Sequence, residues 1–148
     1  MGEEHRFHLA IGSQFENIEL VQVVLNDSLE RLGVDGEARY WVDIAVREAV
    51  ANAIKHGNAQ DPGKRVRVDA GIEGDELVIR IEDEGEGFDP GRLQDPRDPE
   101  NLLKPSGRGI FYMRSFMDDI QYGPGPQGGT VVTLRKRLAR PPGAPAPG

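Results

Sequence analysis

The chain has 148 residues and a formal net charge of −7, and 37% of its residues are hydrophobic. This length suits one domain with a single core, and the composition is ordinary for a globular protein. The acidic balance gives no general attraction for phosphate backbones, so we expect no nucleic-acid partner. The absence of cysteine excludes disulfides, thiolate zinc sites and cysteine nucleophiles. The sequence shows neither a leader-like segment nor a long apolar run, so we expect a cytoplasmic protein with no membrane partner.

The first half of the chain predicts one strand and two helices. Alternation over residues 6–11 predicts a short edge strand, before the Gly12-Ser13 break. Apolar residues recur at threes and fours over residues 15–32, and Gly33 is the expected stop of this first helix. A second, alanine-rich helix follows Asp35 and includes Tyr40 in its apolar pattern. It runs to Gly57-Asn58, whose residues tolerate left-handed conformations.

The second half predicts a hairpin, a long loop, a third helix and two more strands. Apolar residues alternate over 66–72 and 77–81, on either side of a turn at 73–76. Residues 85–109 carry five glycines and four prolines, and a loop of this length is usually functional. A helix from about residue 109 and strands at 120–122 and 130–138 complete a domain over 1–139, and a disordered Pro/Gly-rich tail occupies 140–148. This order predicts an α+β fold with helices on one face of a mixed, mostly antiparallel sheet.

Two polar residues interrupt the apolar pattern of the second helix. Glu48 and Asn52 are four residues apart, so they point from the same helix face, one turn apart. A carboxylate and an amide oxygen there suit a bound Mg²⁺ and a proton-transfer task. Taken alone, the pair is weak evidence and is better explained by a solvent-facing position.

Two glycine-containing segments follow. Asp83-Glu84-Gly85-Glu86-Gly87-Phe88 ends a strand, and its carboxylate and close backbone would suit an adenine ring, although a solvated acidic turn fits the same residues. Ser106-Gly107-Arg108-Gly109-Ile110 begins the third helix, where free N–H groups suit phosphates. On its own the second pattern is commonplace in loops.

In this order the three motifs resemble the Bergerat-fold ATP-binding domains shared by gyrase, the mismatch-repair ATPases, the large heat-shock chaperone and sensor histidine kinases. The resemblance implies a two-layer sandwich of three helices on the sheet, with an ATP lid at about residues 89–106. It also implies roles for individual residues. These are Asn52 on Mg²⁺, Lys55 near a phosphate, Asp83 on the adenine amine with Gly85, Gly87 and Phe88 around the pocket, Ser106, Gly107, Arg108, Gly109 and Ile110 around the phosphates, and Thr130 completing the adenine site.

Within this superfamily, residues 43–57 and 110–118 look like the matching helices of the anti-sigma-factor serine-protein kinases, and the similarity extends over about residues 6–138. The resemblance implies that Glu48 is the general base for a serine or threonine hydroxyl of a STAS-type anti-sigma antagonist, with ATP and Mg²⁺ as cofactors. A sigma factor would be the second partner, and the resemblance allows a homodimer. One departure is Lys104-Pro105, where those kinases often carry a basic residue directly before Ser-Gly-x-Gly. Either Lys104 or Arg108 substitutes for it, or phosphoryl transfer is impaired.

Two other functions use the same pocket. The catalytic domain of a sensor histidine kinase needs a helical segment with a phosphoacceptor histidine, and His5, His8 and His56 all lie outside any such segment. A nucleotide-binding regulatory protein would sequester its target without phosphotransfer, which the Lys104-Pro105 departure keeps open. Turnover with a partner protein separates these cases.

Overall fold

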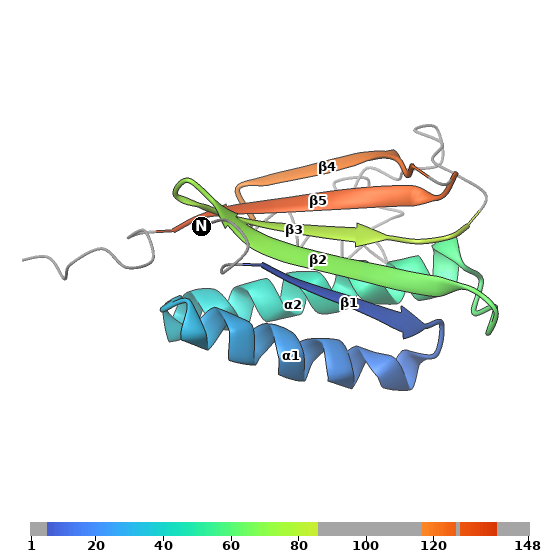
Figure 1. Ribbon diagram of the computed structural model, residues 1–148, viewed down its shortest axis with the longest axis horizontal. Helices are drawn as coiled ribbons and strands as arrows, with labels where there is room; N and C mark the ends of the chain where they lie inside the picture. Colours follow the sequence, from blue (N-terminus) through green and yellow to red (C-terminus); the bar gives the residue numbers. More distant parts are fainter. Residues whose placement is uncertain (1–5, 86–116, 127, 139–148) are drawn as a thin grey trace, which may run out of the picture.

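The computed structural model describes residues 6–85, 117–126 and 128–138. It forms two layers, a five-stranded sheet and two helices that cover one face of the sheet (Figure 1). The elements are β1 (Arg6–Gly12), the 3-10 helix η2 (Phe15–Asn17), α1 (Ile18–Arg31), α2 (Gly36–Asn52), the π-helical turn η3 (Ala53–Gly57), β2 (Arg65–Glu73), β3 (Glu76–Glu82), β4 (Asp119–Pro124) and β5 (Thr130–Arg137). The predicted α+β class is therefore confirmed.

The sheet has the strand order β1-β2-β3-β5-β4. All four described pairings are antiparallel, which agrees with the predicted mostly antiparallel sheet, although the prediction also allowed a mixed one. One row of side chains crosses every strand on the helix side, namely Leu9, Val68, Ile81, Val132 and Tyr122. The hairpin between β2 and β3 turns at Gly74-Asp75, where Gly74 has a φ of 64° that favours glycine. β1 is an edge strand, as predicted.

The core lies between the sheet and the two helices. It takes Val21, Leu25 and Leu29 from α1, and from α2 a valine stripe one turn apart, Val42, Val46 and Val50. The predicted apolar pattern of the second helix was wrong for Tyr40, whose side chain is 59% exposed. Positions two residues apart lie on different faces of a helix. A helix that buries Val42 against the sheet therefore directs the Tyr40 ring away from it.

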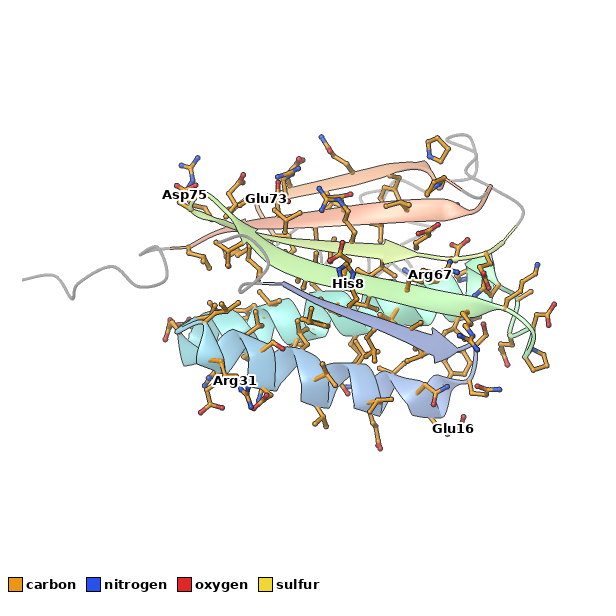
Figure 2. All side chains as sticks on the ribbon, viewed as in Figure 1. His8, Glu16, Arg31, Arg67, Glu73 and Asp75 are labelled. Atoms are coloured by element: carbon orange, nitrogen blue, oxygen red, sulfur yellow. The ribbon has the colours of Figure 1, made fainter. Side chains whose placement is uncertain are left out.

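The opposite face of the sheet carries charged side chains. Arg67 alternates with the buried Val66 and Val68, so it projects from this outer face. The Nδ1 atom of His8 lies 3.4 Å from the Oδ1 atom of Asp69 on the neighbouring strand. Figure 2 shows His8 and Arg67 on adjacent strands of the sheet, far from Arg31, which points away from the sheet on the helix layer. In the described part of the chain, the outer face therefore carries charged side chains, with ion pairs such as Arg67–Glu84 and Arg80–Glu73.

Several expectations fall outside the described residues. These are the third helix from residue 109, the lid at 89–106 and the tail at 140–148. The described helices include none that is both long and apolar enough to cross a membrane.

Candidate functional site

Three polar side chains lie along one face of the second helical segment, and we call Glu48, Asn52 and Lys55 the helix wall. Glu48 and Asn52 are half-buried on α2, and Lys55 is exposed on η3. Burial raises the pKa of Glu48, and the positive charges of Arg47 and Lys55 offset part of that effect. Among the described residues, neither the Glu48 carboxylate nor the Asn52 amide has a hydrogen-bond partner. Their polar atoms are therefore available to a ligand.

Asp83 follows β3 and is the centre of a second set, and we call Asp83, Gly85 and Thr130 the strand-end group. The Asp83 side chain is 7% exposed. Its Oδ1 atom accepts hydrogen bonds from the backbone N–H groups of Gly85 at 2.9 Å and Thr130 at 3.1 Å. The Asp83 N–H donates to the Thr130 carbonyl at 3.0 Å. No donor in the described part of the chain binds Oδ2, so one oxygen is held by the backbone and the other can accept from a ligand.

Three glycines let the backbone approach Asp83 closely. A Cβ atom added at Gly57 or at Gly129 would lie closer than 3.0 Å to atoms of Asp83, and one added at Gly85 would meet the Gly57 carbonyl. Gly57 lies two residues after Lys55, so the end of the helix wall touches the strand-end group. Figure 1 shows this meeting of the C-terminal ends of α2 and β3 at one end of the molecule.

Sequence reasoning did not identify Gly57 and Gly129 as site residues. The available signals were a glycine at the end of the helix that carries Glu48 and Asn52, and a Gly128-Gly129 pair directly before Thr130. Neither signal reveals a contact with Asp83, because that contact joins segments far apart in the sequence.

The helical segment ends at Gly57, as predicted, but neither Gly57 nor Asn58 takes the left-handed conformation that these residues tolerate. Positive φ angles occur instead at Ala59 (53°) and Gln60 (59°), whereas Asn58 has a φ of −88°. Gly57 is required for close approach to Asp83, and the Asn58 side chain is completely buried. Two consecutive non-glycine residues in the left-handed region are unfavourable, so the surrounding contacts must hold this turn.

The predicted site residues divide into those that the structure brings together and those outside its description. The structure joins Asp83, Gly85 and Thr130 by hydrogen bonds and places Glu48, Asn52 and Lys55 along one adjoining surface. The remaining predicted residues lie outside the described part: Gly87, Phe88, Ser106, Gly107, Arg108, Gly109 and Ile110.

The arrangement has a clear chemical capacity. A carboxylate oxygen at the surface of a glycine-rich backbone suits a flat heterocycle that donates from an amine. Amide and carboxylate oxygens beside a lysine suit a phosphate chain with a hard cation. The two sets together are therefore suited to a magnesium nucleotide.

Comparisons with known proteins agree with this capacity. The model of the histidine kinase-like ATPase domain matches residues 11–136. An anti-sigma F factor of Clostridium perfringens is 31% identical over 139 residues, covering 91% of this chain and 98% of that protein. The serine-protein kinase RsbW of Oceanobacillus iheyensis is 27% identical, covering 84% of this chain and 81% of its own length.

A solved structure shares the fold. A structure that contains the RsbU and RsbW domains of a Mycobacterium tuberculosis protein matches with a TM-score of 0.67 at 23% identity, over 92% of this chain and 33% of that one. The fold that the resemblance implied is thus confirmed by the solved structure, and the family is confirmed by the sequence matches. The chain belongs to the histidine kinase-like ATPase family, in the branch of the anti-sigma-factor serine-protein kinases.

Proposed function

We propose that this protein is an ATP-dependent serine/threonine kinase and anti-sigma factor, which phosphorylates an anti-sigma antagonist and sequesters a sigma factor. One observation carries the proposal. Glu48, a carboxylate with a raised pKa and no partner among the described residues, lies on the helix that ends against Asp83, a buried acceptor with one free oxygen. A proton acceptor and a nucleotide anchor on adjoining elements are what phosphoryl transfer to a hydroxyl requires.

In this proposal the strand-end group binds the adenine. Asp83 Oδ2 accepts a hydrogen bond from the exocyclic amine, while the backbone N–H groups of Gly85 and Thr130 hold Oδ1 in place. Because both donors belong to the backbone, the carboxylate cannot swing away without breaking two hydrogen bonds. That rigidity supports selection of a base that carries an amine at this position.

The helix wall serves the phosphates. The Asn52 amide has no partner in the described part of the chain, and its oxygen is of the type that Mg²⁺ prefers, so the residues present fit this cation. Asn52 would hold it, Lys55 would reach a phosphate, and the bound cation would neutralise negative charge on the phosphate chain.

Glu48 is the proposed general base. It accepts the proton of the substrate serine or threonine hydroxyl as the hydroxyl oxygen bonds to the terminal phosphorus and the bond from that phosphorus to the bridging oxygen breaks, so that ADP leaves. Burial favours proton acceptance, because it raises the pKa of Glu48 above its ordinary value. The carboxylate is therefore a stronger base than an exposed one.

The relatives' names support the partners. An anti-sigma F factor and a serine-protein kinase imply, for this chain, a sigma factor and a STAS-type antagonist, with a homodimer and a cytoplasmic location as further parts of the proposal. Lys104-Pro105 lies outside the described residues, so sequestration without transfer is decided by experiment.

The test is incubation with magnesium and γ-labelled ATP and a panel of candidate antagonist proteins. Wild type is compared with Glu48→Ala and Asn52→Ala, and with the controls Glu37→Ala and Asn26→Ala, which change exposed residues of the same types. We expect acid-stable label on a serine or threonine, lost in the first two variants and kept in the controls. Acid-labile label on a histidine would support a histidine kinase instead. Nucleotide binding without any transfer would leave only the sequestering function.

A further inference from the structure

The side-chain amide of Asn58 makes three hydrogen bonds close to the site. The sequence predicted no role for this residue in the site. The side chain is 0% exposed. Its Nδ2 group donates to Ser13 Oγ and to the Arg65 carbonyl, both at 2.9 Å, and its Oδ1 atom accepts from the Glu84 N–H at 2.7 Å. These partners lie in the segment after β1, at the start of β2 and after the end of β3, so one amide joins three parts of the sheet.

Ser13 extends this connection. Its side chain is 1% exposed, and its hydroxyl donates to the Lys64 carbonyl at 2.7 Å while accepting from Asn58. The hydroxyl proton is committed to Lys64, so the direction of the Asn58–Ser13 hydrogen bond is settled. The amide orientation of Asn58 is settled in turn, because both Nδ2 partners are acceptors and the Oδ1 partner is a donor.

The location of Asn58 links it to the candidate adenine site. Asn58 directly follows Gly57, whose Cα lies against the Asp83 carboxylate, and its acceptor oxygen holds the N–H of Glu84, the residue after Asp83. Glu84 is held further by Arg67, whose Nη2 atom lies 3.4 Å from the Glu84 carboxylate. Asn58 is therefore bonded to, or adjacent to, both chain segments that meet at Asp83.

Removal of the amide would loosen those two segments, although the Arg65 N–H and the Arg67 side chain would still bind the Glu84 carboxylate. The Glu84 N–H, the Arg65 carbonyl and the buried Ser13 hydroxyl would each lose one hydrogen-bond partner, and the backbone would shift to recover hydrogen bonds. Asp83 is one residue from the released N–H, so its carboxylate would move with the backbone. A small displacement of a positioning group is enough to weaken recognition strongly.

We propose that Asn58, supported by Ser13, is a positioning residue that sets where the Asp83 carboxylate meets the nucleotide base, and so determines selectivity for a 6-amino purine. The inference rests on the proposed nucleotide binding and adds a specificity determinant to it. Asn58 touches no ligand in this scheme; it acts through Glu84 and Gly57 on Asp83.

The experiment compares two nucleotides that differ only in the 6-amino group. Affinities of ATP and of purine riboside triphosphate are measured by calorimetry for wild type, Asn58→Ala, Ser13→Ala and the exposed control Asn26→Ala. We expect wild type to prefer ATP, and Asn58→Ala to lose affinity for ATP by roughly tenfold, equivalent to about 1.4 kcal/mol. Its affinity for purine riboside triphosphate should stay within about twofold of wild type. Ser13→Ala should shift the preference in the same direction by less, and Asn26→Ala should not shift it.

The ratio of the two affinities separates positioning from general loss of structure. An equal fall for both nucleotides, or an unchanged ratio in Asn58→Ala, overturns the inference while leaving ATP binding intact. Equal wild-type affinities for the two nucleotides also overturn it, together with the assignment of the adenine amine to Asp83, whereas nucleotide binding and phosphoryl transfer would still stand. Failure of wild type to bind either nucleotide overturns the proposed function itself. Circular dichroism monitors folding, and if Asn58→Ala does not fold, the ratio in Ser13→Ala decides the question.

Discussion

The helix wall and the strand-end group are built in opposite ways. In the helix wall, Glu48 and Asn52 project from a regular helix and have no hydrogen-bond partner in the described part of the chain. In the strand-end group, Asp83 is almost fully buried, held by two backbone N–H groups and approached by backbone on several sides. One set presents unpartnered polar atoms for chemistry, and the other is held in place by the surrounding backbone.

This difference indicates which residues can be substituted to change the function without unfolding the protein. Unpartnered side chains on a helix can be replaced at little cost in stability, because no buried partner loses its hydrogen bond. Residues packed against backbone cannot, because any added atom displaces a neighbouring segment. Catalytic rate should therefore depend mainly on the helix wall, and nucleotide affinity together with stability on the strand-end group.

The largest expected effect is on the rate. Glu48→Gln removes the proposed base but keeps its shape, so transfer to the antagonist should fall by about 10²–10⁴-fold. ATP affinity should change little, and stability at neutral pH should rise slightly, because a carboxylate whose burial raises its pKa is destabilised when ionised. Single-turnover transfer and urea unfolding measure the two effects, with Glu37→Gln as control. An unchanged transfer rate would remove Glu48 from the mechanism.

The next largest effect is on ATP affinity. In Asp83→Asn the amide oxygen can keep the hydrogen bonds from Gly85 and Thr130, but an NH₂ group then replaces Oδ2. A donor would face the donating adenine amine, so ATP should bind about tenfold to a hundredfold more weakly, with little change in melting temperature. Equilibrium binding measures this effect, and Asp69→Asn on the outer face is the control. Retained ATP affinity would contradict the assignment of the adenine to Asp83.

An added methyl group that contacts the strand-end group should lower the stability of the protein. Gly57→Ala places a methyl group into the Asp83 carboxylate, so we expect a loss of about 1–3 kcal/mol in the free energy of unfolding. Gly36→Ala, at the start of α2, has its nearest neighbour at 3.5 Å and is the matched control. It should be neutral or slightly stabilising, because alanine favours helix. Equal stabilities of the two variants in urea would show that the backbone at Gly57 yields without cost.

The smallest expected effect is the pH dependence of the free energy of unfolding that comes from two carboxylates in the helix layer. Burial raises the pKa of both Asp43 and Glu48, so the folded state keeps protons that the unfolded chain has already lost. The free energy of unfolding should fall as pH rises from about 4, the ordinary carboxyl range, through the raised values. Each group should contribute less than about 1 kcal/mol, because both remain partly in water.

Asp43→Asn tests this pH dependence. One oxygen of Asp43 accepts from Gln22 at 3.1 Å, and the other is buried without a partner in the described part of the chain. An amide removes the buried charge, so the variant should unfold with a flatter pH dependence, whereas the exposed control Asp119→Asn should keep the wild-type slope. The pH dependence of each variant is measured as the urea concentration at the unfolding midpoint at several pH values. A steeper pH dependence in Asp43→Asn than in wild type would contradict the prediction.

Much of the architecture was predictable from local pattern. Apolar periodicity located α1, α2 and the β2–β3 hairpin, because packing on one face of a helix or strand leaves a period in the sequence. The same periodicity placed Glu48 and Asn52 on one face, since four residues make about one helical turn. The order of the motifs then indicated the family, which the match over residues 11–136 confirmed.

Contacts between segments distant in sequence could not be predicted in this way. Gly57 and Asn58 looked like a helix stop, yet Gly57 packs on Asp83 and Asn58 bonds to Ser13, Arg65 and Glu84. Such roles leave no period, because they depend on which strand ends lie together. The sequence by itself determined the elements, the family and the side chains of the helix wall. Only the tertiary structure decided how Asp83 is held, because its contacts beyond Gly85 come from two distant segments, at Gly57 and at Gly129-Thr130, that meet when the sheet and helices pack.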